Sequence, residues 1–424
     1  MSLLNTVKKF EPKKGDSFGS KFMHTLYDGF FTFLYAPNTV TKGGVHLRDG
    51  MDLKRTMVHV VIALQLCYLF GIWNAGQQHF VALGIHTGYL ESLHLKLWMG
   101  LGKLLPMFIV AHVVGLGVEF YFAARKGHAI EEGFLVTGAL IPLVMPPDLP
   151  LWILALATLF AVLFGKEAFG GTGMNVVNVA LLARVFVFFA YPTTISGDGN
   201  VWVSSLTKNL DTNVYQAAYS WWHSFGDTLF GLFGWVKYPH IGTSVVDGFS
   251  GATPLGYAAK GGMEALSQHF TFTEMIWGAI PGSFGETCKP LIIIGAIFLV
   301  VTKIASWRVM LSMILGVLVM GLIFNAWGKT PMMDIPYYYH FFMGSFLFAM
   351  AFMATDPVTA AATNRGKWYY GFFIGVVGMM IRVINPAYPE GWMLAILFMN
   401  VWAPLIDHIV ISANISKRLS RAKK

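Results

Sequence analysis

Long apolar runs, each close to the length of a bilayer crossing, constrain the fold of this chain more than any other feature. About 20 apolar residues are needed for a helix to span the hydrocarbon core of a membrane, and runs near that length recur along the sequence. Only 12% of the residues are charged, whereas soluble chains carry roughly 25%. Because lipid offers no hydrogen-bond partners, a spanning helix must satisfy its own backbone groups. We therefore predict an all-α polytopic membrane protein.

Hydropathy predicts ten membrane spans, and the basic residues predict their orientation. The expected spans are 56–73, 104–124, 133–146, 149–168, 174–191, 289–306, 309–326, 337–355, 368–384 and 391–412. Lys and Arg gather in residues 1–55 and in the tail 413–424, and basic residues beside spans mark the cytoplasmic side. An even number of spans places both of these segments in the cytoplasm. The net charge of +8 therefore indicates topology and lipid headgroups rather than a nucleic-acid partner.

The spans divide into two expected repeats, 56–191 and 289–412, with five spans in each. A Gly- or Pro-rich turn precedes the last span of both repeats, as "FGGTGMNVVN" and as "INPAYPEGW". An odd number of spans inverts one repeat relative to the other, and inverted repeats often use short or broken helices at functional sites. The intervening residues 192–288 contain no arginine and are expected outside the cytoplasm. Their aromatic stretch 219–235 is expected to lie at the membrane interface.

The chain lacks the usual sequence signatures of several redox sites. Its two cysteines, Cys67 and Cys288, provide neither a disulfide framework nor an iron–sulfur ligand set. We find no haem-attachment motif, no dinucleotide-binding glycine fingerprint and no cleavable signal segment. Oxidation of a nicotinamide cofactor is therefore expected to occur on another polypeptide.

One polar stretch, "VDGFSGATPLG" at residues 246–256, sets a single threonine hydroxyl among small residues. Glycine lets the backbone approach a bulky group closely, and we expect the Thr253 hydroxyl to be exposed and reachable. Taken alone, this pattern favours an ordinary Gly-rich turn.

Longer stretches resemble one family of membrane proteins nearly from end to end. They are "VTKGGVHLRDGMDLKR" (40–55), "EEGFLVTG" (131–138), "GGTGMNVVN" (170–178), "FFAYPTTISGD" (188–198), "DGFSGAT" (247–253), "MATDPVTA" (353–360) and "INPAYPEGWMLAILFMNVWAPLIDH" (384–408). The family contains the B subunit of the sodium-translocating NADH:quinone oxidoreductase and the D subunit of the Rnf complex. The resemblance implies membership of a six-subunit complex in the bacterial inner membrane. Its partners would be subunits of the A, C, D, E and F types, and it would be catalytic only within that complex.

The resemblance also implies a chain of flavin cofactors. The stretch "DGFSGAT" is similar to the sequence at which a transferase attaches FMN to threonine through a phosphoester, here at Thr253. The other motif residues are Asp247, Gly248, Ser250, Gly251 and Ala252. Electrons would pass from this FMN to a non-covalent riboflavin and then to ubiquinone, coupled to Na⁺ export. The implied riboflavin-binding residues are Gly171, Thr172, Asn175 and Asn178, although helix capping alone would explain an asparagine at a helix start.

A quinone site is implied at Gly115, Glu119 and Phe134, with His112 as a weaker neighbour. Where the family pattern has two adjacent glycines, this chain has Leu116 after Gly115, which puts the exact pocket shape in doubt. An ionisable residue inside a membrane is by default a functional hypothesis. A glutamate near a helix end can also simply reach the interface.

A Na⁺ path is implied at Asp356 and Asp407, because hard cations prefer oxygen ligands. The alternative for Asp356 is a turn or cap role, since a proline follows it directly. Arg184 lies within an expected span, where we expect it to face a flavin phosphate or an acid. No further metal site is expected.

Two other functions stay open at this point. The first is an Rnf-type membrane subunit, which works with ferredoxin and NAD rather than quinone. The second, of another class, is a passive solute channel or transporter, because two five-span repeats also suit permeation. The basic N-terminal segment and the quinone-site stretch favour the quinone reductase.

Overall fold

The computed structural model describes residues 9–12, 15, 17–34, 43–44, 53–82, 88–127, 133–195, 202–203, 213–234, 251–385 and 390–422. Every regular element in these ranges is a helix, so the all-α prediction is confirmed. Within this part of the chain, six helices are long and apolar enough to cross a membrane, and three further apolar helices are shorter.

Two sets of five successive elements form the two halves of the molecule. The first half comprises α3 (Leu53–Ala82), α4 (Leu93–Lys126), α5 (Phe134–Val144), α6 (Leu151–Gly165) and α7 (Val179–Ala190). The second comprises α11 (Lys289–Val301), α12 (Trp307–Trp327), a broken element, α15 (Asn364–Ile384) and α16 (Trp392–Ala422). The broken element consists of α13 (Tyr339–Phe342), α14 (Phe346–Phe348) and the π-helix η4 (Ala349–Met353).

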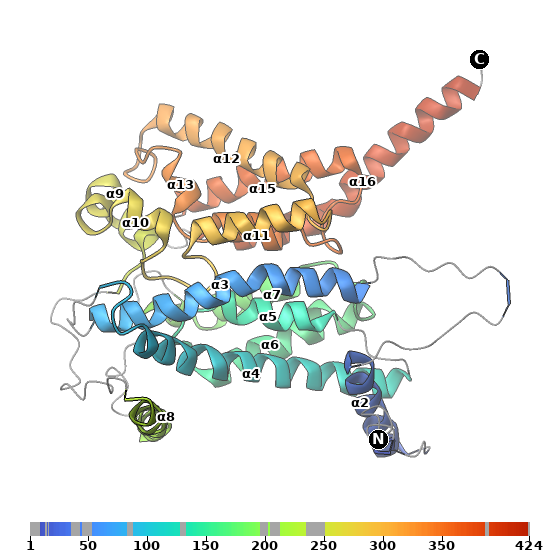
Figure 1. Cartoon of the computed structure of the whole chain (residues 1–424). Helices are drawn as coiled ribbons and strands as arrows, with labels where there is room; N and C mark the ends of the chain where they lie inside the picture. The colour runs from blue at the N-terminus through green and yellow to red at the C-terminus, as the bar shows by residue number, and fades with distance from the viewer. Residues whose placement is uncertain are drawn as a thin grey trace.

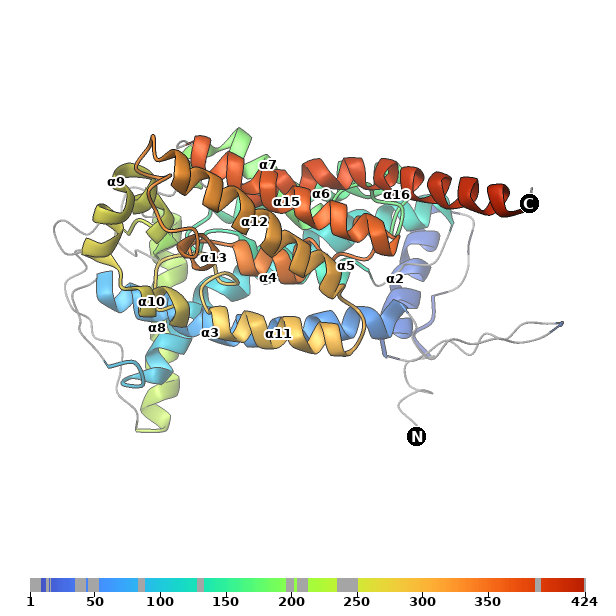
Figure 2. The same cartoon turned by 90° about the horizontal axis from the view of Figure 1, so that it is seen from above.

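Equivalent helices have equivalent neighbours in the two halves. In the first half α4 packs on α6 and α6 on α7, and in the second α12 packs on α15 and α15 on α16. The halves meet through α3 with α11 and through α7 with α16, and Figures 1 and 2 both show α3 and α11 side by side. Like-with-like contact is what a two-fold relation between repeats produces. The arrangement agrees with the predicted pair of five-element repeats.

The three shorter apolar helices, α5, α7 and α11, do not reach the length of a bilayer crossing. The 11 residues of α5 and the 12 of α7 span about 17 Å at 1.5 Å per residue, against a hydrocarbon core of about 30 Å. The prediction of one continuous span at 337–355 is wrong, because the chain breaks between α13 and α14, where Gly344 has a φ of +64°. The spans expected at 133–146 and 174–191 are likewise shorter in the structure, and α7 begins only after a glycine-rich turn.

Non-helical backbone within a membrane protein needs hydrogen-bond partners in the protein, and the first half supplies some of them to the segment before α11. At the end of α5, the Leu143 carbonyl accepts a hydrogen bond of 2.9 Å from the Gly285 amide. The Asn74 side chain on α3 donates to the Ile280 carbonyl at 2.9 Å. The non-helical segment before α11 is therefore held by hydrogen bonds to the first half.

Helices also occupy part of the interval between the repeats. They are α8 (Asn213–Leu232), α9 (Pro254–His269) and α10 (Phe272–Trp277). Figure 1 places all three at one end of the bundle, which we call the α9 end. Both chain termini lie at the opposite end, the terminal end.

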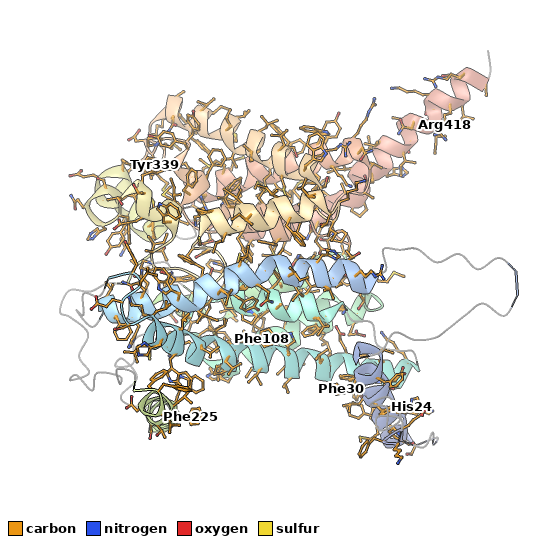
Figure 3. The ribbon with its side chains drawn as sticks, in the orientation of Figure 1. His24, Phe30, Phe108, Phe225, Tyr339 and Arg418 are labelled. Carbon is orange, nitrogen blue, oxygen red and sulfur yellow. The ribbon has the colours of Figure 1, made fainter. Side chains whose placement is uncertain are left out.

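Two helices cross the long α4, one at each end (Figure 1). At the terminal end, α2 (Phe18–Leu34) packs on α4, with the rings of Phe30 and Phe120 6.5 Å apart between centroids. At the α9 end, Trp98 of α4 stacks on Trp222 of α8 at 4.2 Å, and each indole nitrogen donates to the other residue's carbonyl. Figure 3 shows Phe30 on α2 and Phe225 on α8 at these opposite ends. The interfacial location expected for residues 219–235 stays a prediction; the structure places α8 at one end of the bundle.

Candidate functional site

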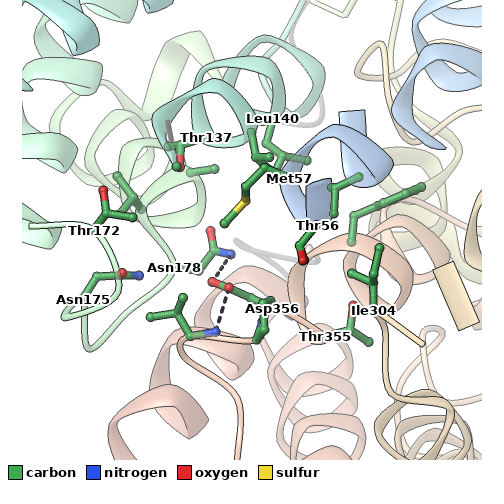
Figure 4. Close-up of a pocket in the computed structure, with 18 of the residues that line it drawn as sticks. Thr56, Met57, Thr137, Leu140, Thr172, Asn175, Asn178, Ile304, Thr355 and Asp356 are labelled. Atoms are coloured by element: carbon green, nitrogen blue, oxygen red, sulfur yellow. Dashed lines mark hydrogen bonds between the residues drawn. The ribbon is translucent and has the colours of Figure 1, made fainter. Parts of the chain in front are cut away.

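A pocket lies between the two repeats, toward the terminal end. It contains about 810 Å³ of empty space, including its open mouth. The first half contributes the start of α3, one face of α5 and the turn before α7, and the second half contributes the end of α11 and the segment after η4. Figure 4 shows side chains from both halves pointing toward this space. The pocket is therefore a property of the paired repeats, not of either one.

The glycine-rich turn before α7 forms one wall of the pocket. Gly170, Gly171 and Gly173 have φ values of +123°, +109° and +84°, which side chains with a Cβ rarely adopt. This turn places Thr172 and Asn175 in the pocket lining. Gly171, which was predicted with them, shapes the turn and is not part of the lining.

Asn178 connects the turn to α7 and to the other repeat. Its side-chain oxygen accepts from the Leu181 amide at 3.1 Å and so caps α7. Its amide nitrogen donates to Asp356 Oδ2 at 3.4 Å, across 178 positions of sequence. One side chain thus begins a helix in the first repeat and contacts a carboxylate of the second.

Asp356 lines the pocket from the second repeat, directly after the broken element. Besides Asn178, its carboxylate accepts from the Val358 amide at 3.1 Å and from the Thr359 hydroxyl at 3.0 Å. Figure 4 shows the contact between Asn178 and Asp356 as a dashed line. The predicted turn role is therefore real, and the same carboxylate also borders the pocket.

The pocket lining mixes apolar and polar side chains. The apolar ones come from α3, α5, and the end of α11 with the residues after it, and include Met57, Leu140 and Ile304. Among them lie hydroxyls, amides, a carboxylate and one ammonium group. Small-molecule sites commonly combine a mostly apolar lining with a few placed polar groups, and this pocket has that composition.

The ammonium belongs to Lys166, which follows the last residue of α6. It forms an ion pair with Glu119 of α4, and both side chains are at most 5% exposed. Lys126 and Glu167 form a second pair between the same segments at 3.1 Å. The sequence alone allowed Glu119 to reach the membrane interface. In the structure it is buried and paired with Lys166 instead. The part played by Lys166 was not predicted.

The three predicted quinone-site residues are neighbours in the structure. The Phe134 ring, at the start of α5, fills the space over Gly115, so that a Cβ there would overlap the ring. His112 lies on the other side, with its ring centroid 6.1 Å from that of Phe134. Phe134 is fully buried. The residues form a closed, packed cluster beside the pocket.

Asp407, the second predicted Na⁺-path acid, holds the start of α15. It accepts from the Ala362 amide at 2.6 Å and from the Thr363 amide at 3.0 Å, and the Thr363 hydroxyl also donates to it. Thr363 is in turn the N-cap of α15. The structure does not bring Asp407 into the lining of the pocket that contains Asp356.

Thr253 lies at the α9 end, where it caps α9. Its hydroxyl oxygen accepts from the Gly256 amide at 3.2 Å, and Gly251 two residues earlier has a φ of +61°. The expectation of an exposed hydroxyl is wrong for this structure, because Thr253 is 7% exposed and its neighbours Ala252 and Leu255 are buried. The motif residues Asp247, Gly248 and Ser250 lie outside the described residues.

Buried charges gather between the repeats at the α9 end. Arg184 on α7 pairs with Glu390 before α16 at 3.4 Å, which is the acid expected for this arginine. Lys289 donates to the Glu286 carbonyl and, at 3.1 Å, to that of Gly344. Arg382, at the end of α15, is fully buried and donates to the His340 carbonyl at 2.8 Å. Apart from Arg184, none of these charges was singled out from the sequence.

Together these features define a polytopic helical membrane protein with two inverted five-element repeats and a mixed polar and apolar pocket at their interface. Residues 40–416 match the model of the NQR2, RnfD, RnfE family, and the chain belongs to that family. Three relatives bear the name of the B subunit of Na⁺-translocating NADH-quinone reductase. The protein of Chromohalobacter salexigens is 40% identical, over 99% of this chain and 97% of its own length. Those of Ectopseudomonas mendocina and Azotobacter vinelandii are 41% and 40% identical, over 94% of each chain. The resemblance found in the sequence is thereby confirmed.

Proposed function

We propose that this chain is the B subunit of a Na⁺-translocating NADH:quinone reductase, and that it relays electrons between flavins to ubiquinone. Full-length similarity to proteins with that name supports the complex. The relay would run from FMN on Thr253 to riboflavin in the pocket between the repeats and on to ubiquinone, coupled to Na⁺ export. The flavins supply the one- and two-electron chemistry that amino-acid side chains lack.

The pocket is the observation that carries this proposal. Three of the four residues implied for riboflavin, namely Thr172, Asn175 and Asn178, line one space together with Asp356. An isoalloxazine ring has an apolar benzenoid end and a pyrimidine end rich in hydrogen-bonding groups. The lining of the pocket contains both apolar side chains and hydrogen-bonding groups, which are the partners that the two ends need, so the residues present fit the group.

The position of Thr253 at a helix N-terminus favours attachment of a phosphate, but its burial requires the segment to open first. A phosphoester at the N-cap of α9 would place negative charge at a helix N-terminus, which is favourable by about 0.3–1 kcal/mol. Because the hydroxyl is buried and accepts a hydrogen bond from Gly256, the transferase would act before this segment packs, or on an opened form of it.

Na⁺ and quinone are assigned to the same region. Asp356 would offer oxygen ligands to Na⁺ at the edge of the riboflavin pocket, which brings cation and electron transfer close together. The quinone would approach the cluster of Gly115, Glu119 and Phe134 beside that pocket. Asp407 stays a proposed Na⁺-path residue on the strength of the resemblance alone.

The proposed setting is the inner membrane of a bacterium, with both termini in the cytoplasm and Thr253 on the other side. The basic residues at both ends support this orientation. The other members of a six-subunit complex would bring electrons from NADH.

The test is flavin analysis of the purified complex, made together with its flavin transferase. We expect this polypeptide to carry the mass of one FMN and to fluoresce on a denaturing gel, and Thr253→Val to abolish both signals. Acid precipitation should release one non-covalent flavin per complex, and Asn175→Leu should reduce that amount. A chain with the mass of bare polypeptide, or a complex with no releasable flavin, would contradict the proposal.

The family also contains Rnf-type proteins, which makes a ferredoxin:NAD oxidoreductase the second candidate. Reduction of added ubiquinone by NADH in the reconstituted complex separates the two. We expect quinone reduction that depends on Na⁺, whereas reduction of NAD by ferredoxin without quinone activity would favour the Rnf type.

A further inference from the structure

Lys166 is a buried ammonium group at the edge of the proposed flavin pocket, and none of the sequence patterns points to it. Of the residues that line the pocket in the described part of the chain, it is the only basic one. Its side chain is 4% exposed. A charge this deeply buried is costly unless it is paired, so its position requires an explanation.

We propose that Lys166 is a positioning residue which orients the pyrimidine end of the flavin and raises its affinity for electrons, with Glu119 as the counter-charge. This inference rests on the proposed riboflavin site and names the groups that set its behaviour.

The backbone of Lys166 ties it to the wall that is proposed to hold the flavin. Its carbonyl accepts from the amides of Phe169 and Gly171, at 3.2 and 3.1 Å. These bonds fix the start of the glycine-rich turn that carries Thr172 and Asn175. The position of the ammonium group relative to the turn is therefore set by backbone hydrogen bonds and not only by a flexible side chain.

The side chain is fixed from the other direction by α4. Its Nζ contacts Glu119 and lies 5.9 Å from the centroid of the Phe134 ring. Phe134 in turn packs against Gly115. The predicted quinone cluster and the pocket are thus joined through a single ion pair.

The opposite charges of Lys166 and Glu119 suit a ring that becomes more negative when it is reduced. A reduced isoalloxazine carries its added negative charge mainly at the pyrimidine end. A nearby ammonium group stabilises that charge more strongly in a protein interior than in water, while the carboxylate keeps the ammonium paired when the ring is oxidised. Lys166 therefore favours the reduced ring, and Glu119 opposes it.

This relation predicts shifts of opposite sign for two variants. Lys166→Gln removes the positive charge and should lower the reduction potential of the non-covalent flavin. Glu119→Gln removes the negative charge, leaves the ammonium group, and should raise the potential. A merely structural role for the pair would give equal effects in both variants, or none.

The chain offers a matched control in the adjacent pair. Lys126 and Glu167 join the same two segments at 3.1 Å, and neither residue lines the pocket. Lys126→Gln should therefore leave the flavin potential unchanged. Lys166→Arg, which keeps the charge, should restore most of the effect lost in Lys166→Gln.

The experiment is a spectroelectrochemical titration of the non-covalent flavin in the purified complex, with flavin content measured in parallel. We expect Lys166→Gln to weaken binding of reduced relative to oxidised flavin at least tenfold, or about 30 mV for a two-electron couple. The inference would be overturned if the reduction potential of the flavin is unchanged in both Lys166→Gln and Glu119→Gln, or shifts in the same direction in both. If Lys166→Gln fails to assemble, Lys166→Arg and Glu119→Gln decide it. A complex without any non-covalent flavin would overturn the proposed function itself, which is a separate result.

Discussion

The two ends of the interface between the repeats differ in chemistry although they are built from equivalent elements. At the terminal end, the repeats enclose an open pocket, and a hydrogen bond between Asn178 and Asp356 joins them at its edge. At the α9 end, the interface is closed around buried charges, with the ion pair of Arg184 and Glu390 across it. An inverted duplication thus supplies two similar breaks in the helices and allows each to specialise.

One pair of positions illustrates the specialisation. Lys166 follows the fourth helix of the first repeat, and Arg382 lies in the last turn of the fourth helix of the second. Lys166 borders open space and has a carboxylate partner. Arg382 is fully buried, donates to a backbone carbonyl, and lies 4.8 Å from the ring centroid of Trp392. One cation is available to a ligand, whereas the other is part of the packing.

The largest effect is expected from removing the ion pair between Arg184 and Glu390 at the α9 end. Glu390→Leu should cost about 3–5 kcal/mol of stability, because it removes the carboxylate that pairs with buried Arg184 across the interface. Thermal unfolding of the purified complex in detergent measures the loss. Glu264→Gln, at an exposed acid on α9, is the control. An unchanged unfolding midpoint in Glu390→Leu would mean that this ion pair does not hold the repeats together.

The cluster beside the pocket should resist added volume. Gly115→Ala places a methyl group into the ring of Phe134 and should cost about 1–3 kcal/mol. Gly117→Ala, two positions along the same helix, meets nothing within 4 Å and should be neutral. Combining Gly115→Ala with Phe134→Leu should recover part of the loss in the same unfolding assay. Equal effects at both glycines would show that the packed cluster does not form.

Substitution of the two aspartates should have different effects: on stability at Asp407, and on the Na⁺ requirement at Asp356. Asp407→Asn should cost about 1–3 kcal/mol, because it disturbs the acceptor of the Ala362 and Thr363 amides. Asp356→Asn should instead raise the Na⁺ concentration needed for half-maximal quinone reduction by about tenfold, or 1.4 kcal/mol. Steady-state rates against Na⁺ measure the second effect. A raised Na⁺ requirement in Asp407→Asn as well would assign both carboxylates to the cation path.

The smallest effect is expected at the hydrogen bond between Asn178 and Asp356 at the open end. Asn178→Ala removes the cap of α7 and should cost about 0.5–2 kcal/mol. Asn178→Ser keeps a capping oxygen but loses the donor to Asp356, and should retain most of the stability. Its flavin content should nevertheless fall. If serine destabilises as much as alanine, the bond between the repeats matters more than the cap.

Hydropathy located most of the helices but missed the break in the eighth span. The run 337–355 stays apolar through Gly344, so composition carries no sign of the positive φ that interrupts it. The ends of α4 and α16 were also missed, since both helices extend beyond the apolar stretch into polar residues.

The candidate site was predicted in part. The resemblance named Asn178 and Asp356 separately, and only the folded repeats bring them into contact. Lys166 was missed because, at the edge of a span, it fits the basic-residue rule for the cytoplasmic side. Lys289 and Arg382 also lie at the edges of predicted spans, where a charge is normally explained by solvent. Burial and pairing cannot be predicted from such positions without the neighbouring repeat.

The helices that cross α4 have a consequence for the lipid around the protein. Trp98 and Phe120, where α8 and α2 make contact, are separated by about 33 Å of helix at 1.5 Å per residue, close to the thickness of a typical hydrocarbon core. The two attachment points act as a ruler for membrane thickness. In bilayers of markedly shorter or longer acyl chains, hydrophobic mismatch would strain both contacts. That strain would be transmitted to the helices that form the pocket.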